Sequence, residues 1–303
     1  MAPFHFWLLG PLAVGLYFLV LLDERGNGLF PGWLYGLGLY GVGTSWIYVS
    51  IHQHGGASPV LAGALVALFA SGLAIFPMLQ AWLFVRLKSE HPVPAAALFA
   101  VLYLALEWVL TWFLTGFPWV ALGYGQIESP LRHLAPLGGV ALVSAGVLVS
   151  GLALALVIRQ LRGAGPVAGK ALASTLVVLA GPWMLAAGVG HIQWTEPAAT
   201  RTAALVQGNV AQATKWNPEN RLPIIEHYRT LTEPHWGADL ILWPEAAITT
   251  FEHQAEELLA VLDARGKAEG SSLVLGLPAV RAYPGGEYAF LNAARGLGTA
   301  EGR

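Results

Sequence analysis

The sequence predicts an α-helical transmembrane bundle over residues 1–192, followed by an α/β domain over residues 193–303. Two observations lead to this division. The chain is 55% hydrophobic and only 11% charged, with a mean hydropathy of +0.57, values typical of a membrane protein that has a soluble part. The charges are also uneven, because residues 1–192 hold 7 Lys/Arg and 5 Asp/Glu, whereas residues 193–303 hold 9 and 13.

Net charge and cysteine content narrow the possible functions. A net charge of −2 gives no indication of a nucleic-acid partner. The 303 residues contain no cysteine, so within them we expect no disulfide, no thiolate metal site and no cysteine nucleophile.

Six apolar runs predict six membrane-spanning helices. Each run is close to the ~20 residues that cross a bilayer, and six in succession do not fit a soluble core. The first lacks the basic start and small-residue cleavage site of a signal peptide, so we expect it to span. The runs are Phe6–Leu22, Leu29–Val49, Val60–Val85, Val93–Leu114, Gly138–Ile158 and Ala171–Val189.

Basic residues at the ends of these runs predict the orientation. The segments Ser50–Pro59 and Thr115–Pro136 carry only Arg132, so the positive-inside rule places them, and residues 193–303, outside the cytoplasm. Aromatic residues near the same ends fit an interfacial belt: Trp46, Tyr48, Trp119 and Trp194. The basic ends predicted to be cytoplasmic carry Arg25, Arg86, Lys88, Arg159, Arg162 and Lys170.

Glycines in the second run spell GxGxxG at Gly36, Gly38 and Gly41. A dinucleotide site would need a preceding strand and a following βαβ unit, and this run has neither. Gly32 and Gly36 also form GxxxG, which favours close packing of helices.

Two other polar features lie in the bundle. His52 and His54 form HxH on an outer loop, and two ligands are too few for us to predict a metal site. Glu107 lies inside the fourth run, where an ionisable group serves either a functional site or the joining of helices. The residues leave both readings of Glu107 open.

The last third alternates strand and helix patterns, which predicts an α/β layer. About 100 residues then provide four strands and two helices, which leaves one face of the sheet uncovered. Helix spacing recurs at Leu222, Ile225, Tyr228 and Leu231, and again at Ala255, Leu258, Leu259 and Leu262. The expected strands are Thr202–Gln207, Asp239–Trp243, Ser272–Leu277 and Tyr288–Arg295.

The stretch Ala238–Ile248, ADLILWPEAAI, is the strongest candidate for chemistry. Its buried strand ends at Pro244, which cannot continue a ladder, and delivers the carboxylate of Glu245 just past the strand end. Thr249 and Glu252 then fit a capping box that opens a helix. A solvated glutamate in an ordinary strand-to-helix loop is the competing reading.

An ordered set of motifs now resembles the apolipoprotein N-acyltransferases of bacteria. The likeness is collinear over nearly the whole chain. In the apolar part it lies at Gly43–Gly56 (GTSWIYVSIHQHGG), Glu107–Trp108, Thr115–Tyr124 (TGFPWVALGY) and Leu134–Gly139 (LAPLGG); beyond it, at Ala204–Trp216 (ALVQGNVAQATKW), Leu240–Ile248, Ser271–Gly276 and Tyr288–Asn292.

This resemblance implies a nitrilase-like αββα sandwich on the outer face of the membrane, incomplete in this chain, and a Glu–Lys–Cys triad. Glu245 matches the glutamate of that triad by motif. Lys267 does not match the lysine, because it precedes the third strand in a different motif. The family's lysine and cysteine follow the segment that matches Tyr288–Asn292. We therefore expect an internal fragment that lacks both residues and the first and last spanning helices.

The implied reaction moves an acyl chain from a phospholipid to the terminal amine of a diacylglyceryl-cysteine lipoprotein. A partly desolvated Glu245 would take the thiol proton, and a thioester would form without metal or cofactor. Trp216, Trp119 and Pro244 would line the mouth of the site, with Trp216 as a mobile lid. A membrane-tethered amidase and a non-enzymatic membrane bundle with an outer module are the alternatives.

Overall fold

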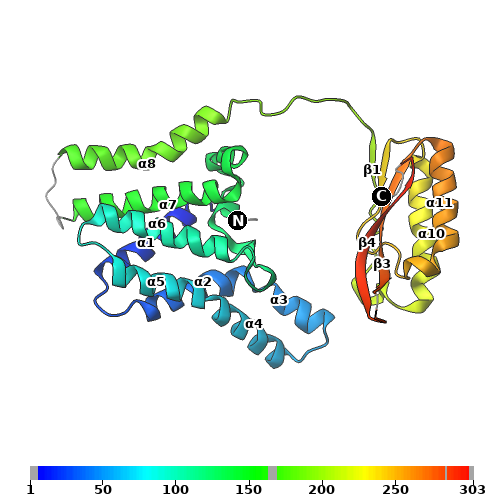
Figure 1. Cartoon of the computed structure of the whole chain (residues 1–303), viewed down its shortest axis with the longest axis horizontal. Helices are drawn as coiled ribbons and strands as arrows, with labels where there is room; N and C mark the ends of the chain where they lie inside the picture. The colour runs from blue at the N-terminus through cyan, green and yellow to red at the C-terminus, as the bar shows by residue number, and fades with distance from the viewer. Residues whose placement is uncertain (1–5, 163–168, 284, 300–303) are drawn as a thin grey trace. The chain divides into compact units, whose positions relative to one another are not determined.

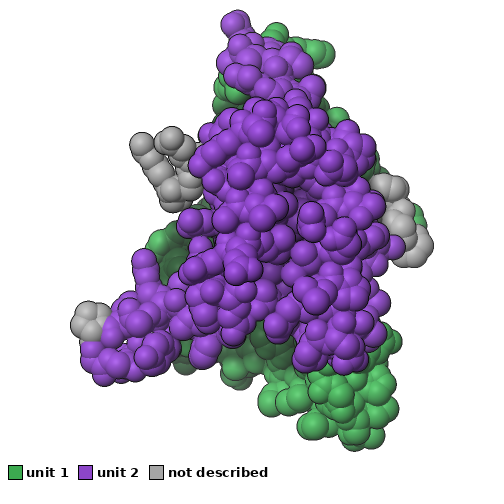
Figure 2. Space-filling model, turned by 90° about the vertical axis from the view of Figure 1, so that its right-hand side faces the viewer, with its two compact units in different colours: residues 1–195 green, residues 196–303 purple. Residues whose placement is uncertain are grey.

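The computed structural model describes residues 6–162, 169–283 and 285–299. Its internal contacts divide the chain into two compact units, residues 1–195 and residues 196–303, coloured separately in Figure 2. The first unit is helical, and the second is a sheet with helices (Figure 1).

The first unit is built from apolar helices and short turns. A π-helical turn covers Ser50–His54, and 3₁₀ turns cover Phe113–Thr115, Pro118–Val120, Leu122–Gln126 and Pro130–Leu134. The helices are α1 Leu9–Asp23, α2 Leu29–Gly43, α3 Ile47–Val49, α4 Pro59–Leu73, α5 Ile75–Leu87, α6 Pro92–Val109, α7 Ala135–Leu161 and α8 Gly169–Val189.

Four helical segments of the described chain are long and apolar enough to cross a membrane, where the sequence predicts six. They are Pro59–Leu87, Pro92–Val109, Pro130–Leu161 and Leu172–Val189. Helices α1 and α2 have 15 residues each, about 22 Å at 1.5 Å per residue, short of a ~30 Å hydrocarbon core. The second run is not one helix, because α2 ends where Thr44 turns its hydroxyl onto the Tyr40 carbonyl (2.7 Å).

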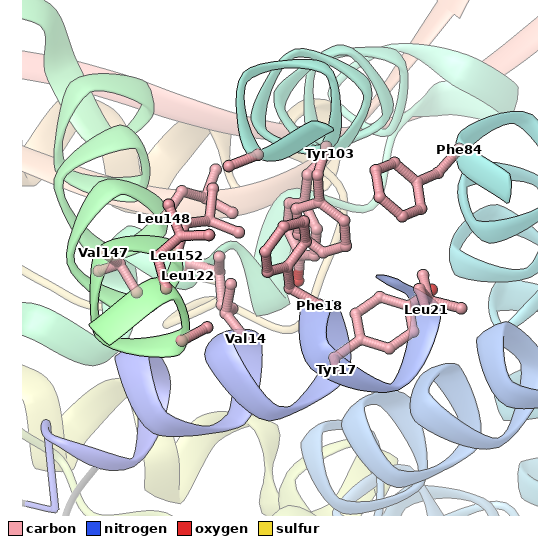
Figure 3. Packing of buried hydrophobic residues seen from close by; sticks show 14 of the residues in the cluster. Val14, Tyr17, Phe18, Leu21, Phe84, Tyr103, Leu122, Val147, Leu148 and Leu152 are labelled. Atoms are coloured by element: carbon pink, nitrogen blue, oxygen red, sulfur yellow. The ribbon is translucent and has the colours of Figure 1, made fainter. Parts of the chain in front are cut away.

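The core of this unit lies between α1, α5, α6 and α7. Figure 3 shows side chains from these helices converging, with Tyr17 and Phe18 on α1, Phe84 on α5 and Tyr103 on α6. Phe18, Phe84 and Phe99 are fully buried, and their ring centroids lie 5.4–5.9 Å apart in edge-to-face or tilted contacts.

The glycines of α2 pack as the GxxxG pattern predicts. A Cβ at Gly32 would lie 2.6 Å from the Ala81 Cβ, and one at Gly36 would lie 2.7 Å from the Ala74 Cα. Gly38 and Gly41 have nothing within 4 Å of the same position. The first pair therefore brings α2 against α5, which confirms close packing as the use of these glycines.

The second unit is an α/β layer, as the alternating patterns predict. Its sheet has the order β1-β2-β3-β4, with the first three strands parallel and β4 antiparallel to β3. The strands are β1 Ala203–Leu205, β2 Leu240–Leu242, β3 Ser272–Ala282 and β4 Tyr288–Gly298, and the helices are α9 Gln212–Lys215, α10 Arg221–Thr232 and α11 Glu256–Glu269.

Helices α10 and α11 lie on the same side of the sheet (Figure 1). The covered face buries Ile241, Leu273 and Leu275 completely. Alternation and strand register place Leu205 and Phe290 on the opposite face, where they are 75% and 74% exposed. The described part of this unit thus leaves one apolar sheet face uncovered, as two helices for four strands predict.

Two sequence predictions for this unit are wrong. The capping box at Thr249 and Glu252 does not form, because α11 begins only at Glu256 and Ala255 caps it without a side-chain bond. Glu252 instead lies in a 3₁₀ turn, 3.4 Å from Arg295 of β4. The helical spacing of Leu222 does not place it on the packed face of α10, because it is 75% exposed and the buried face carries Ile224, Tyr228 and Thr232.

Candidate active site

The end of β2 is anchored by a buried tryptophan. The Trp243 backbone N–H donates to the Val274 carbonyl (2.9 Å), which extends the pairing with β3 by one residue. Its indole Nε1 donates to Thr232 Oγ1 (2.8 Å), and its ring stacks on Tyr228 with centroids 5.1 Å apart. With Trp243 fixed below the sheet edge, the next two residues, Pro244 and Glu245, emerge at the surface and are exposed.

A tight turn then holds Glu245 against β3. The Ala247 N–H donates to the Pro244 carbonyl (3.2 Å), and Ala246 has the left-handed φ of +48°. The turn lies directly over Gly276 of β3, where an added Cβ would be 2.8 Å from the Ala246 nitrogen and 2.9 Å from the Glu245 Cα. Only glycine allows the backbone of the turn to come this close to β3. The position of Glu245 after β2 therefore depends on Gly276 of β3.

Two side chains contact Glu245. Asn292 of β4 donates from Nδ2 to Glu245 Oε1 at 2.5 Å. Lys215 donates from Nζ to the Glu245 backbone carbonyl at 3.2 Å. Asn292 lies in a segment that resembles the family, but nothing in the sequence indicates that it contacts Glu245. Nothing in the sequence assigns a role to Lys215 either. Both contacts arise because three separate segments meet at the carboxyl end of the sheet.

The partial desolvation expected for Glu245 in the complete site stays a prediction, and among the described residues its carboxylate is exposed. The cause is the uncovered sheet face on which the turn lies. An exposed carboxylate held by one amide donor can accept a proton from a group placed against it.

Lys267 and Trp216 lie in different relation to this glutamate. Lys267 Nζ is 2.8 Å from Asp263 Oδ2, one turn earlier on α11, whereas the side chains that bond Glu245 in the described residues are Asn292 and Lys215. Trp216 directly follows Lys215 at the end of α9 and is 52% exposed. Trp216 is thus half-exposed and next in sequence to Lys215, which contacts Glu245. A role for Trp216 as a wall or lid of the site stays a prediction.

Comparison with known proteins adds the family. The family model described as "Apolipoprotein N-acyltransferase N-terminal domain" matches residues 1–153, half of the chain. The chain belongs to the apolipoprotein N-acyltransferase family. The described helices α1 to α6 and most of α7 lie within that match.

Individual apolipoprotein N-acyltransferases match over nearly the whole chain. The enzyme of Pseudomonas syringae pv. tomato is 39% identical over 310 residues, which cover 100% of this chain and 60% of the relative. That of Azotobacter vinelandii is 42% identical, covering 98% and 58%, and that of Photobacterium profundum is 37% identical, covering 91% and 52%. The chain therefore spans about 60% or less of the length of these relatives.

In the N-acyltransferase N-terminal domain, Trp119 belongs to an exposed aromatic stack. Its ring lies parallel to Trp46 with centroids 5.1 Å apart and to Phe117 at 5.7 Å. Trp119 is 60% exposed and Trp46 is 46% exposed. The structure brings together three rings of one unit here, whereas Glu245 belongs to the other unit.

Polar side chains of the same domain are used locally. Glu107 Oε1 accepts from the Leu122 backbone N–H (2.7 Å), which joins α6 to the end of the loop that carries Trp119. The His52 Nδ1 lies 2.8 Å from the Ala57 carbonyl, within its own turn. Throughout residues 6–162, 169–283 and 285–299, no three His, Asp or Glu side chains are grouped as a metal site would require.

Proposed function

We propose that this chain provides the membrane bundle and the glutamate-bearing sheet of an apolipoprotein N-acyltransferase. The enzyme would transfer an acyl chain from a phospholipid to the terminal amine of a diacylglyceryl-cysteine lipoprotein. The observation that carries the proposal is the match to relatives of that name over the whole chain, at 39% identity for Pseudomonas syringae. Substrates held in the membrane also suit a soluble-type layer attached to apolar helices.

Glu245 is the proposed general base. It would take the proton of a thiol, the thiolate would attack the phospholipid ester, and the alkoxide of the lysophospholipid would leave with a proton. The lipoprotein amine would then attack the thioester and restore the thiol. A lysine would stabilise the oxyanion. The 303 residues contain no cysteine, so the thiol of this reaction must come from outside them.

The exposed sheet face supports a nitrilase-like sandwich. Leu205 and Phe290 are exposed on this face, and a second sheet packed there would bury them. Glu245 lies on the same side, since its turn covers Gly276, so a second layer would also remove water from the carboxylate. Trp216 and Pro244 would form the mouth of the resulting site, with Trp119 facing the lipid.

We further propose a six-span topology in the bacterial inner membrane, with residues 193–303 on the outer side. The charged ends of the helices support this orientation. Helices α1 and α2 would span with help from their flanking turns, because a short helix is tolerated where the bilayer thins around it. The loop that precedes Lys170 lies outside the described residues.

The test uses a chimera in which this chain replaces the corresponding residues of the Pseudomonas syringae relative. With a labelled phospholipid, the chimera should form an acyl-enzyme, whereas the 303 residues alone should form none. In the chimera, Glu245→Gln keeps the shape and removes the base, so acylation should fall by about 10²–10⁴-fold. Lys267→Gln, which removes a charge bonded to Asp263, is the matched control and should leave acylation unchanged.

Near-normal acylation by the Glu245→Gln chimera would remove the glutamate from the mechanism. An acyl-enzyme on the 303 residues alone would contradict the requirement for a thiol. The amidase and the non-enzymatic bundle are not favoured by the relatives' names. Hydrolysis of a simple amide without acyl transfer, or no acyl-enzyme from a folded chimera, would reopen them.

A further inference from the structure

A small cavity lies inside the helical unit, between α2, α5, α6 and the loop that carries Trp119. Its volume is about 30 Å³. Most of its wall is apolar, with Leu39, Phe76, Leu106 and Phe117 among the lining residues. Polar side chains from three helices also line it: Tyr40, Gln80, Tyr103 and Glu107.

Gln80 is the side chain in this cavity that needs a ligand. It is 1% exposed, and its Oε1 lies 2.9 Å from the Tyr17 hydroxyl, whose single proton goes either to this oxygen or to the Pro77 carbonyl at 3.0 Å. Its Nε2 is buried and has no hydrogen-bond acceptor among the described residues. A buried amide donor without a partner costs about 1–3 kcal/mol, so a protein normally supplies an acceptor.

Glu107 provides a second polar group on the wall of the same cavity. One carboxyl oxygen accepts from the Leu122 N–H (2.7 Å). Ser144 also forms a side-chain hydrogen bond to this carboxyl group. A carboxylate has about four lone-pair positions, so these two bonds still leave capacity for further donors. The cavity thus combines a donor that lacks an acceptor with a group that can take more donors. A hydroxyl oxygen, which donates and accepts, satisfies both kinds of group.

The size of the cavity decides which hydroxyl fits. A water needs about 10–15 Å³ of such volume, so about 30 Å³ is enough for one or two waters. We propose that this cavity is a water-binding site, in which bound water accepts from Gln80 Nε2 and hydrates the Glu107 carboxyl group. Under this proposal Glu107 belongs to a polar site and also joins elements.

The cavity lies against the loop that carries Trp119. Phe117, Pro118 and Val120 of that loop line the cavity, and its end is held by Glu107 through Leu122. The loop is strained at its start, because Leu114 and Thr115 both have positive φ (48° and 78°). Bound water would therefore help to hold α5, α6 and the Trp119 loop in one arrangement.

Radiolytic footprinting of the full chain in lipid nanodiscs tests the proposal. X-ray pulses convert bound water into hydroxyl radicals, which oxidise the side chains beside it. Tyr103 lines the cavity and is 7% exposed; Tyr228 is 2% exposed and packs on Trp243. We expect Tyr103 to be oxidised several-fold faster than Tyr228. Equal rates in the wild-type chain would overturn the water site.

Two variants then examine Gln80 itself. Gln80→Met removes the amide, so oxidation of Tyr103 should fall to the rate of Tyr228. Gln126→Met is the matched control, because Gln126 is also 1% exposed but bonds the Trp7 carbonyl (2.9 Å) and Ser129 (2.7 Å). That variant should leave Tyr103 oxidation unchanged. Unchanged oxidation in folded Gln80→Met would contradict the role of Gln80; if that variant does not fold, the wild-type comparison decides.

Discussion

At the scale of single residues, the proposed base depends on contacts that the motif does not contain. Glu245 is placed by Trp243 below it and by the turn over Gly276, and its carboxylate is then oriented by Asn292. An amide donor fixes one carboxylate oxygen and leaves the other free to take a proton. Asn292 is therefore a positioning residue for the proposed reaction.

Replacing Asn292 should slow acylation without unfolding the sheet. In the chimera, we expect Asn292→Leu to reduce the acylation rate by about 10–100-fold, because a hydrogen bond to a charged group contributes about 1.5–3 kcal/mol. Asn292 is exposed, so the melting temperature should change little. Loss of the folded state together with activity would show a structural role instead, and an unchanged rate would remove Asn292 from the site.

Asp239 gives the α/β unit a measurable acid dependence. The backbone N–H and hydroxyl of Thr202, together with Arg201, hold the pKa of Asp239 at about 2, below its ordinary 3.8. As the pH falls, the unfolded chain takes up the proton first, so the contribution of these bonds is complete above about pH 4 and is lost toward pH 2.

The test compares melting of the wild-type chain with that of Asp239→Asn. The difference in melting temperature should be largest at neutral pH and should shrink between about pH 4 and pH 2. A difference that stays constant across this range would show that Asp239 acts through shape alone.

At the scale of elements, close helix packing depends on particular glycines of α2. A methyl group at Gly36 would lie 2.7 Å from the Ala74 Cα, a backbone atom of the residue that joins α4 to α5, whereas Gly38 is open. We expect Gly36→Ala to destabilise the bundle by about 1–3 kcal/mol. Gly38→Ala should be neutral or stabilising by up to about 1 kcal/mol, since alanine favours helix. Melting of both variants in nanodiscs distinguishes them.

Equal effects of the two alanines would show that helix propensity, not the α2–α5 contact, sets stability here.

The basic residues at the ends of the helices also make structural contacts that a count of charges does not reveal. Lys88 donates from Nζ to the carbonyls of Leu21, Leu22 and Glu24 at 2.8–2.9 Å, so it caps the C-terminus of α1 from the end of α5. One of the charges that predicts orientation is thus also part of the fold.

At the scale of the whole molecule, the lack of cysteine makes the topology directly testable. A single cysteine introduced at Gly285, in the β3–β4 turn, should react with a membrane-impermeant thiol reagent added from the outer side. A cysteine at Gly163, which lies outside the described residues, should be protected from the same reagent. Labelling at Gly163 together with protection at Gly285 would reverse the proposed orientation.

By itself, the sequence determined the classes of structure and the family. Apolar run length and charge distribution depend only on local composition, so they predict helices and an α/β layer without knowledge of contacts. The order of the strand and helix patterns, together with the motif Trp243-Pro244-Glu245, likewise placed Glu245 at the end of a strand. Helix ends were less certain: α2 stops at Gly43 and α11 starts at Glu256, because turns and neighbours override local capping signals.

The tertiary structure decided which residues act together. Asn292 meets Glu245 across 47 positions of sequence, and Lys215 across 30. Gln80 and Glu107, on α5 and α6, share a cavity with a loop that ends at Leu122. No periodicity encodes such meetings, because they result from strand pairing and helix packing between distant segments. The exposed face of the sheet has the same origin, since burial is a property of the layers that are present and not of the strand that carries Leu205.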